Sequence, residues 1–255
     1  MDERYKDYEE LIIKKEQLLK DAHSYHFCYL QNFGELMTEI LQTKIDCIRL
    51  KKTITYCMQR INMGEEINTD LMNAQIDTEM QTYYQDLEEL IREKERADDS
   101  KEAEEFQANL AKKIFRRIAK KLHPDINAKT GQIEELSELW DKVMIAYRTF
   151  NVDALQEYEV LLNHIMTELG EEGFAPVLEN IEELIQKAEL QIAEIISTVP
   201  YTYGELLKDE EAVKAKKLEL QSELDEFTTY KKELEETLEK LTGNGGAKFT
   251  WQMIL

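Results

Sequence analysis

The feature that most constrains this chain is a set of apolar residues that recur every three or four positions. One such run extends from Phe33 to Ile61 and a second from Ile76 to Leu90. Apolar residues at this spacing line one face of an α-helix, and a sustained heptad favours helices that pack along their length. Three prolines and nine glycines among 255 residues leave few points at which a helix must end. We therefore predict an all-α protein.

Two predicted pairs of long helices flank the middle of the chain. In the first pair, residues 62–64 predict a helix end, and Asn68 or Thr69 predicts the next cap. A short turn between two long helices favours an antiparallel hairpin, which we place at residues 1–97. We also expect a kink near residues 23 and 24 of this hairpin.

The second pair follows the middle segment. Its heptad continues through residues 178–199, a loop begins at Pro200, and the returning helix extends to Leu241. We predict a C-terminal coiled hairpin over residues 171–242 and a tail over residues 243–255. The tail ends in apolar residues, which either pack back on the bundle or engage another chain. The sequence leaves open whether the hairpins pair within one chain or between two chains of a homodimer.

Positive charge is concentrated in the middle of the chain. On a helix, the cations of residues 112–121 fall on one half of the circumference and the apolar residues of this stretch fall on the other. The cations are Lys112, Lys113, Arg116, Arg117, Lys120 and Lys121, and the apolar residues are Ile114, Phe115, Ile118, Ala119 and Leu122. Pro124 ends this helix, because proline disfavours helical geometry in the preceding residue and cannot donate the next backbone hydrogen bond. His123, Pro124 and Asp125 therefore lie at the mouth of a loop.

This string resembles helix II and the His-Pro-Asp loop of a J domain, the module of DnaJ-type co-chaperones. The family pattern Tyr-Arg-Lys-Leu-Ala, then His-Pro-Asp and Asn, is matched by Phe115, Arg116, Arg117, Ile118, Ala119, His123, Pro124, Asp125 and Asn127. The next family helix is matched by Trp140, Val143, Ala146, Tyr147 and Phe150, and Tyr158 takes the place of the closing tyrosine. The resemblance covers about residues 110–158, within a module that we place at residues 98–170.

Two features depart from the family pattern. The short first helix of the family is not evident at its usual distance, and the residues that resemble it, Tyr83, Tyr84 and Leu87, lie much further upstream. Ile126 replaces the basic residue after the aspartate, and Leu122 replaces an aromatic residue. These departures concern the packing of the module more than its exposed motif.

The resemblance implies a function in docking. In the family, the His-Pro-Asp loop and the basic helix engage an ATP-driven heat-shock chaperone of the DnaK class and speed its ATP hydrolysis. The implied chaperone-binding residues here are His123, Pro124, Asp125, Arg116, Arg117, Lys112, Lys113, Lys120, Lys121 and Asn127. A J protein performs no covalent chemistry itself, so the resemblance implies no enzyme activity in this chain.

The overall charge opposes two other classes of partner. The net charge is −21, and residues 112–121 contribute +6, so the rest of the chain carries −27. Phosphate groups repel such a surface, so we expect no general binding to nucleic acid or to anionic membranes. A nucleic-acid-binding helix at residues 112–121 is a weaker alternative, because its one aromatic residue, Phe115, lies on the apolar half, away from any base.

The sequence also lacks the residue groupings that enzymes and metal sites need. It contains no nucleophile with a matching context, no glycine-rich phosphate loop and no metal-ligand spacing. An enzyme would have to use His123 and Asp125 as an acid-base pair. His23 and His26 are one turn apart but lack a third ligand. We therefore expect no catalysis, no cofactor and no metal.

Cysteines and apolar runs bear on the location of the protein. Cys28, Cys47 and Cys57 fall in one predicted helix, in which the closest two are roughly 15 Å apart. They cannot bridge within that helix, so we expect free thiols in a reducing compartment. No apolar run reaches the roughly 18 residues that span a bilayer, and the first residues do not resemble a signal peptide. We expect a cytoplasmic protein.

We therefore predict a co-chaperone in which two helical hairpins flank a J-domain-like module. The module would recruit the chaperone ATPase, and the hairpins would position a client protein whose identity the sequence does not show. The alternative is a coiled-coil scaffold or adaptor with a J-like segment that no longer engages a chaperone. The departure at the first helix makes this alternative reasonable, and an assay of the loop separates the two.

Overall fold

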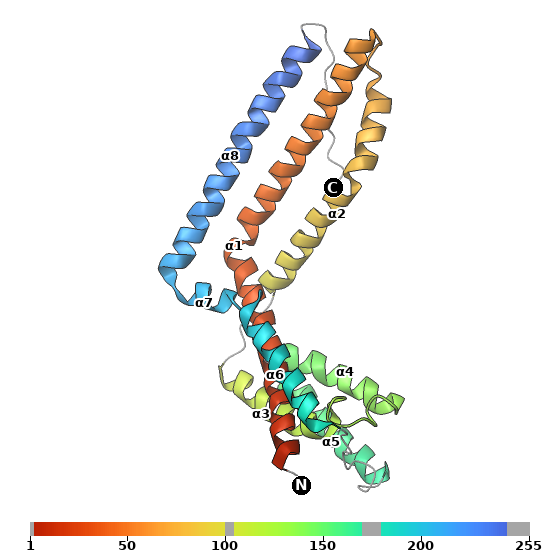
Figure 1. Ribbon diagram of the computed structural model, residues 1–255, viewed down its shortest axis with the longest axis vertical. Coiled ribbons are helices and arrows are strands. Elements are labelled where there is room, and N and C mark those ends of the chain that lie inside the picture. Colours follow the sequence, from red (N-terminus) through yellow and green to blue (C-terminus); the bar gives the residue numbers. More distant parts are fainter. Residues whose placement is uncertain (1–2, 100–104, 170–179, 244–255) are drawn as a thin grey trace. The chain divides into compact units, whose positions relative to one another are not determined.

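The computed structural model describes residues 3–99, 105–169 and 180–243, which are α-helices joined by turns and contain no strand (Figure 1). The predicted all-α class is therefore confirmed. The helices are α1 (Glu3–Met63), α2 (Thr69–Asp99), α3 (Glu105–Leu122), α4 (Glu134–Arg148), α5 (Val152–Leu169), α6 (Ile181–Ser197), α7 (Tyr203–Lys208) and α8 (Glu210–Thr242). None of the helices in these ranges combines enough length with enough apolar residues to cross a lipid bilayer.

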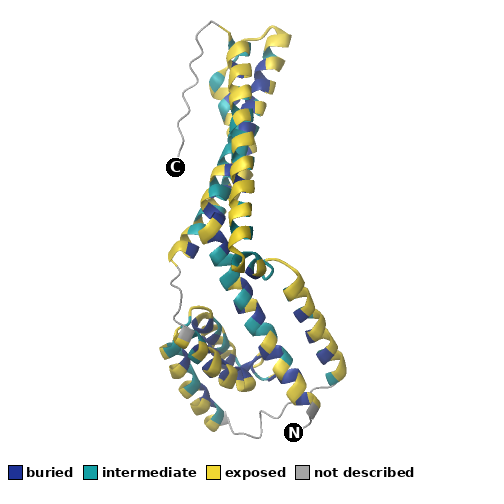
Figure 2. Ribbon diagram, turned by 90° about the vertical axis from the view of Figure 1, so that its left-hand side faces the viewer, coloured by how far each residue is buried: buried dark blue, intermediate teal, exposed yellow. Residues whose placement is uncertain are grey.

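The helices bury one stripe of side chains and expose the rest (Figure 2). In α3, the apolar residues from Ala111 to Leu122 are buried, whereas the cations between them are exposed. In α8, the buried residues are Leu220 and Leu238, so most of this helix faces solvent. These stripes follow from the spacing of three and four residues in the sequence, which returns apolar side chains to the same helix face.

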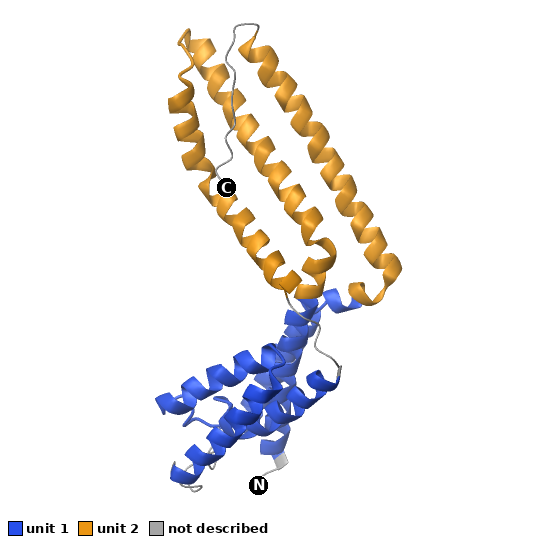
Figure 3. Ribbon diagram, turned by 180° about the vertical axis from the view of Figure 1, so that it is seen from behind, with its two compact units in different colours: residues 1–26, 100–205 blue, residues 27–99, 206–255 orange. Residues whose placement is uncertain are grey.

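The chain divides into two compact units (Figure 3). Unit 1 comprises residues 1–26 and 100–205, and unit 2 comprises residues 27–99 and 206–255. The helix α1 continues without a break through residues 23 and 24, where a kink is expected from the sequence. Its first part belongs to unit 1 and its remainder to unit 2.

This division differs from the predicted boundaries for a reason of length. The predicted hairpin over residues 1–97 pairs α1 with α2, but α1 has 61 residues and α2 has 31. The partner helix therefore covers only the later part of α1, and a hydrogen bond from the Gln31 amide to the Ala97 carbonyl, 2.6 Å long, marks its last turn. The predicted hairpin over residues 171–242 is likewise divided, because α6 packs in unit 1 and α8 in unit 2.

Unit 2 has an apolar core along its three long helical segments. Cys57 of α1 and the α2 residues Met72, Ile76 and Met80 are buried in this core, which Leu238 of α8 joins. Two ion pairs attach α8 to α1, one from Lys44 to Glu223 at 2.7 Å and one from Lys231 to Asp46 at 2.6 Å. Lys231 thus meets a carboxylate of α1 at a position where both side chains are about one-third exposed.

The main core of unit 1 joins α3, α4 and α5. It contains Ile13, Ala111, Ile114, Phe115, Ile118, Ala119, Leu122, Leu136, Leu139, Val143, Ala146, Tyr147, Leu155, Leu162 and Ile165. At its centre the rings of Phe115 and Tyr147 are stacked, with centroids 3.9 Å apart and planes 5° from parallel. A second, smaller cluster brings Tyr8 and Ile12 of α1 against Ile126 and Ile185. The first turns of α1 therefore pack against both the loop that follows α3 and α6.

A glycine in α7 tests the packing of unit 1. Gly204 is buried, and a Cβ atom added there would lie 2.6 Å from Cε2 of Tyr25, whose ring meets Tyr201 edge-on. Gly204→Ala therefore forces the Tyr25 ring to move, which is expected to lower the free energy of unfolding by about 1–3 kcal/mol. Chemical denaturation monitored by circular dichroism measures this loss.

The matched control is Gly131→Ala. Gly131 is exposed, and the nearest atom to its added Cβ would be the Ala128 carbonyl oxygen at 3.9 Å. This variant is expected to keep the wild-type stability to within about 0.5 kcal/mol. Equal stability of the two variants would contradict the close approach of Tyr25 to Gly204.

Candidate functional site

The cationic helix is held by its apolar half. Ile114, Phe115 and Ile118 are almost completely buried in the core of unit 1, and the cations on the opposite half are exposed. The helix ends at Leu122, directly before His123 and Pro124. The row of positive charge therefore lies on α3, and the His-Pro-Asp turn directly follows this helix.

Three of the six cations bind side chains of unit 1. The Arg117 guanidinium donates to both carboxylate oxygens of Glu159 on α5, at 2.6 and 2.7 Å, and these hydrogen bonds lower the pKa of the Glu159 carboxyl. Lys121 donates to the side-chain oxygen of Asn163, one turn further along α5, at 2.9 Å. The Lys120 ammonium pairs with the carboxylate of Glu9 on α1. These three cations therefore help to hold α3 against its neighbours.

The other three cations are Lys112, Lys113 and Arg116. They are exposed and have no ion-pair partner in the part of the chain that the structure describes. Lys112 and Arg116 also border a cleft of about 540 Å³ that α1, α3 and α6 line together. The free positive charge of the cationic helix is thus concentrated in its middle turns.

The turn after α3 is closed by His123. The carbonyl oxygen of His123 accepts the backbone N–H groups of Ile126 and Asn127, at 2.9 and 2.8 Å. The imidazole Nδ1 accepts the backbone N–H of Asp125 at 3.0 Å. Because Nδ1 acts as an acceptor, the proton of the neutral ring lies on Nε2. This arrangement fixes both the backbone of the turn and the orientation of the ring.

Asn127 closes the other end of the loop. Its side-chain amide donates to the Lys121 carbonyl oxygen at 2.8 Å, and its side-chain oxygen accepts the Lys129 N–H at 3.1 Å. The residue is buried. Asn127 is among the predicted chaperone-binding residues, and in this geometry it would act by setting the shape of the loop.

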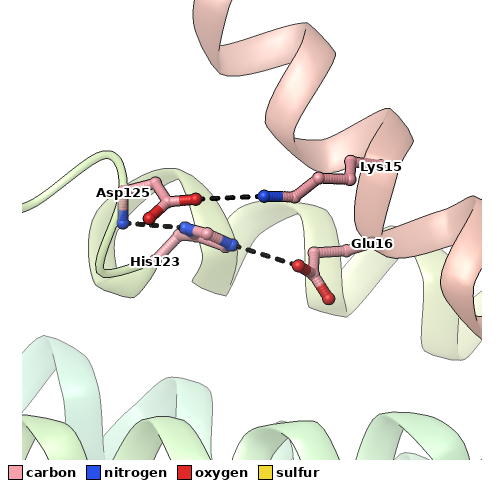
Figure 4. A network of polar contacts seen from close by, with 4 residues as sticks. All are labelled: Lys15, Glu16, His123 and Asp125. Carbon is pink, nitrogen blue, oxygen red and sulfur yellow. Dashed lines mark hydrogen bonds and ion pairs between the residues drawn. The ribbon is translucent and has the colours of Figure 1, made fainter. Parts of the chain in front are cut away.

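His123 and Asp125 both contact α1 (Figure 4). His123 is 4% exposed, with its ring edge-on to Trp140 at 4.7 Å, and its Nε2 lies 3.5 Å from the Glu16 carboxylate. The Asp125 carboxylate accepts a hydrogen bond from the Lys15 ammonium at 3.1 Å. Pro124 is exposed. The sequence places all three residues at the open mouth of a loop, whereas in the structure α1 covers the histidine.

Sequence reasoning missed the α1 residues of this site. Lys15 and Asp125 are 110 positions apart in the chain. One local signal was available, since Glu9 and Glu16 are seven residues apart and fall on one helix face, close to the apolar positions Tyr8 and Ile12. Acidic residues beside an apolar stripe are common on helices, so this signal does not identify a partner.

A buried lysine lies behind the stacked rings. The Lys20 ammonium sits 3.9 Å from the centroid of the Tyr147 ring and 3.6 Å from that of Phe150. The Tyr147 hydroxyl donates to the side-chain oxygen of Gln17 at 2.5 Å. Burial lowers the pKa of Lys20 to about 8 and raises the pKa of Tyr147. These contacts attach α1 to α4 by polar and cation–π interactions.

The described residues offer no evident metal site. They contain no group of three His, Cys, Asp or Glu side chains that could hold a metal ion. Cys47 and Cys57 are buried, and burial raises the pKa of each thiol. The site formed by α3, its loop and α1 is a set of charged and aromatic side chains.

The burial of the Lys20 ammonium should be visible in how the free energy of unfolding changes with pH. Its pKa is about 8 in the folded protein, below the usual 10.5, so above about pH 8 the folded state binds fewer protons than the unfolded state. The free energy of unfolding therefore gains a contribution as the pH rises from about 8 to about 10. Chemical denaturation at several pH values measures this gain, which Lys20→Met is expected to lack.

The control for this measurement is Lys14→Met. Lys14 is exposed on the same helix, so this variant is expected to keep the wild-type pH dependence. Burial raises the pKa of Tyr8 to about 12 in the folded protein. Above about pH 10 tyrosine therefore ionises more readily in the unfolded state, which lowers the free energy of unfolding. The pH series stops near pH 10 for this reason. Identical pH profiles for wild type and Lys20→Met would contradict the buried ammonium.

Comparison with known proteins gave no match. No protein-family model, no curated protein and no solved structure matches this chain. The resemblance to a J domain therefore rests on the sequence alone, over about residues 110–158.

Proposed function

We propose that this chain is a J-domain-type co-chaperone, which docks on a DnaK-class chaperone and stimulates the ATP hydrolysis of its partner. The observation that carries the proposal is the closed turn at His123, Pro124 and Asp125, joined directly to a helix with an exposed cationic face. Docking would use the exposed Pro124, the half-exposed Asp125 and the free cations of α3.

The rigidity of the turn supports a role in recognition. Hydrogen bonds to the carbonyl oxygen and ring of His123 hold the backbone of the turn, and Asn127 fixes its exit. A motif that already has its bound shape loses little conformational entropy when a partner binds. The core formed by α3, α4 and α5 supplies the rigid base for this motif.

Charge supports an acidic partner surface. Lys112, Lys113 and Arg116 project from a chain whose net charge is −21, so they form a local positive patch in an acidic protein. Complementary charge of this kind raises the association rate and selects the orientation of docking more than it raises the final affinity. The proposed chemistry belongs to the partner, which would hold and hydrolyse ATP.

A second function is favoured by one observation. His123 is buried and Asp125 is paired with Lys15 inside unit 1, so both side chains already have partners. A coiled-coil scaffold or adaptor would use the same turn as a structural element, and its long helices would then provide the binding surfaces. The two functions differ in whether the turn acts on a chaperone.

Stimulation of ATP hydrolysis distinguishes these functions. The wild-type chain is expected to accelerate ATP hydrolysis by its cognate DnaK-class chaperone, and Asp125→Asn and His123→Gln are expected to lose this effect by about tenfold or more. Steady-state phosphate release at increasing concentrations of the chain measures it, and circular dichroism checks that each variant is folded.

The matched control is Asp141→Asn, which makes the same change on an exposed position of α4. It is expected to stimulate as the wild type does. If the folded wild type gives no stimulation over a range of salt and concentration, the co-chaperone proposal is wrong and the scaffold function is favoured.

The three free cations predict a salt-dependent interaction. Exposed charges are screened over about 10 Å at 0.1 M salt, so the concentration of the chain that gives half-maximal stimulation should rise with salt. The triple variant Lys112→Gln, Lys113→Gln, Arg116→Gln should need a higher concentration at low salt and respond less to added salt. Titrations of the ATPase rate at several salt concentrations measure both effects.

A charge-matched control separates the patch from the net charge. The triple variant Lys187→Gln, Lys208→Gln, Lys232→Gln removes the same charge from exposed positions on other helices. It should keep the wild-type salt response. Equal responses of the two triple variants would show that the cationic face of α3 plays no specific part.

A further inference from the structure

The first turns of α1 supply a charged partner for each side of the motif. Glu16 meets the His123 ring, Lys15 meets the Asp125 carboxylate, and Glu9 meets the Lys120 ammonium at the end of the cationic helix (Figure 4). All three contacts join residues of unit 1. A single segment, residues 9–16, thus provides partners for the histidine, the aspartate and a neighbouring cation together.

The α1 side of these contacts is largely buried. The side chains of Glu9, Lys15 and Glu16 are 8%, 14% and 11% exposed. Beside them, Tyr8 and Ile12 pack on Ile126, the residue that follows Asp125. The segment therefore covers the turn with both charged and apolar side chains.

Two of the three groups on the motif side are more open, whereas His123 is buried. The side chains of Asp125 and Lys120 are 46% and 49% exposed, so solvent screens their ion pairs and each pair contributes little by itself. Contacts of this kind can be exchanged for contacts with another protein that presents the same charges. A partner that reads Asp125 must offer it a cation, and Lys15 already occupies that position.

We propose that residues 8–16 of α1 are an intramolecular competitor for the chaperone, so that docking requires their release from the turn. The inference rests on the proposed co-chaperone function and adds its regulation. The His123 ring, and the Asp125 carboxylate free of its Lys15 partner, are available to the chaperone only in molecules in which this segment has moved away. The apparent affinity for the chaperone is then the intrinsic affinity reduced by the fraction of open molecules.

The test uses the full chain with Lys15→Met. This substitution keeps the length and apolar stem of the side chain, removes the partner of Asp125 and leaves every residue of the motif unchanged. The concentration for half-maximal stimulation of the chaperone ATPase is expected to fall by about fivefold, with the same maximal rate, because more molecules are open. Adding Asp125→Asn to Lys15→Met should abolish the stimulation.

The control is Lys6→Met, which removes the same charge from an exposed position of α1 outside residues 8–16. It should behave as the wild type. Amide hydrogen exchange without chaperone provides a second readout, and backbone N–H groups of residues 125–127 should exchange faster in Lys15→Met than in Lys6→Met. Circular dichroism should show that both variants retain the helical fold.

The outcomes separate the two proposals. If Lys15→Met and wild type stimulate equally at every concentration, the competitor inference is wrong and the co-chaperone function stands. If both are folded and neither stimulates, the co-chaperone function is wrong and the inference falls with it. A higher concentration requirement for Lys15→Met would show that Lys15 assists docking, which also overturns the inference.

Discussion

The packing of the apolar half of α3 is the constraint on which the candidate site depends. Phe115 stacks on Tyr147, and the residues one turn before and after it are buried between α4 and α5. This packing turns every cation of the helix outward and brings the helix end to Pro124, where the turn must form. The positions of His123 and Asp125 follow from the core behind them.

How much of this could be predicted depends on the distance in sequence over which each feature is encoded. The helix ending at Leu122 and the turn at Pro124 follow from residues within one or two turns, and the structure has both. A heptad indicates that a helix has a partner without identifying the partner. For this reason the sequence did not show that α6 and α8 belong to different compact units, or that Lys15 contacts Asp125.

The contacts of His123 and Asp125 with α1 have a different role under each of the two proposed functions. For a scaffold, the buried His123 and the paired Asp125 complete a stable turn. For a co-chaperone, these contacts are one of two states, and the weakness of ion pairs at half-exposed groups permits exchange between them. Pro124 ends α3, and its exposed side chain, like the three exposed cations of α3, would be accessible to a partner.

The distribution of free charge also limits how a partner could dock. Arg117 and Lys121 are bonded to α5, so the free cations extend from Arg116 to Lys112, roughly 9 to 15 Å along the helix from its end at Leu122. A surface that reads both ends must follow α3 over that length. The segment of α1 before residue 19 lines the cleft beside Lys112 and also contacts Lys120. A partner that binds along α3 would therefore meet α1 both beside Lys112 and beside Lys120. Displacement of α1 would then expose the cationic face and the His-Pro-Asp turn together.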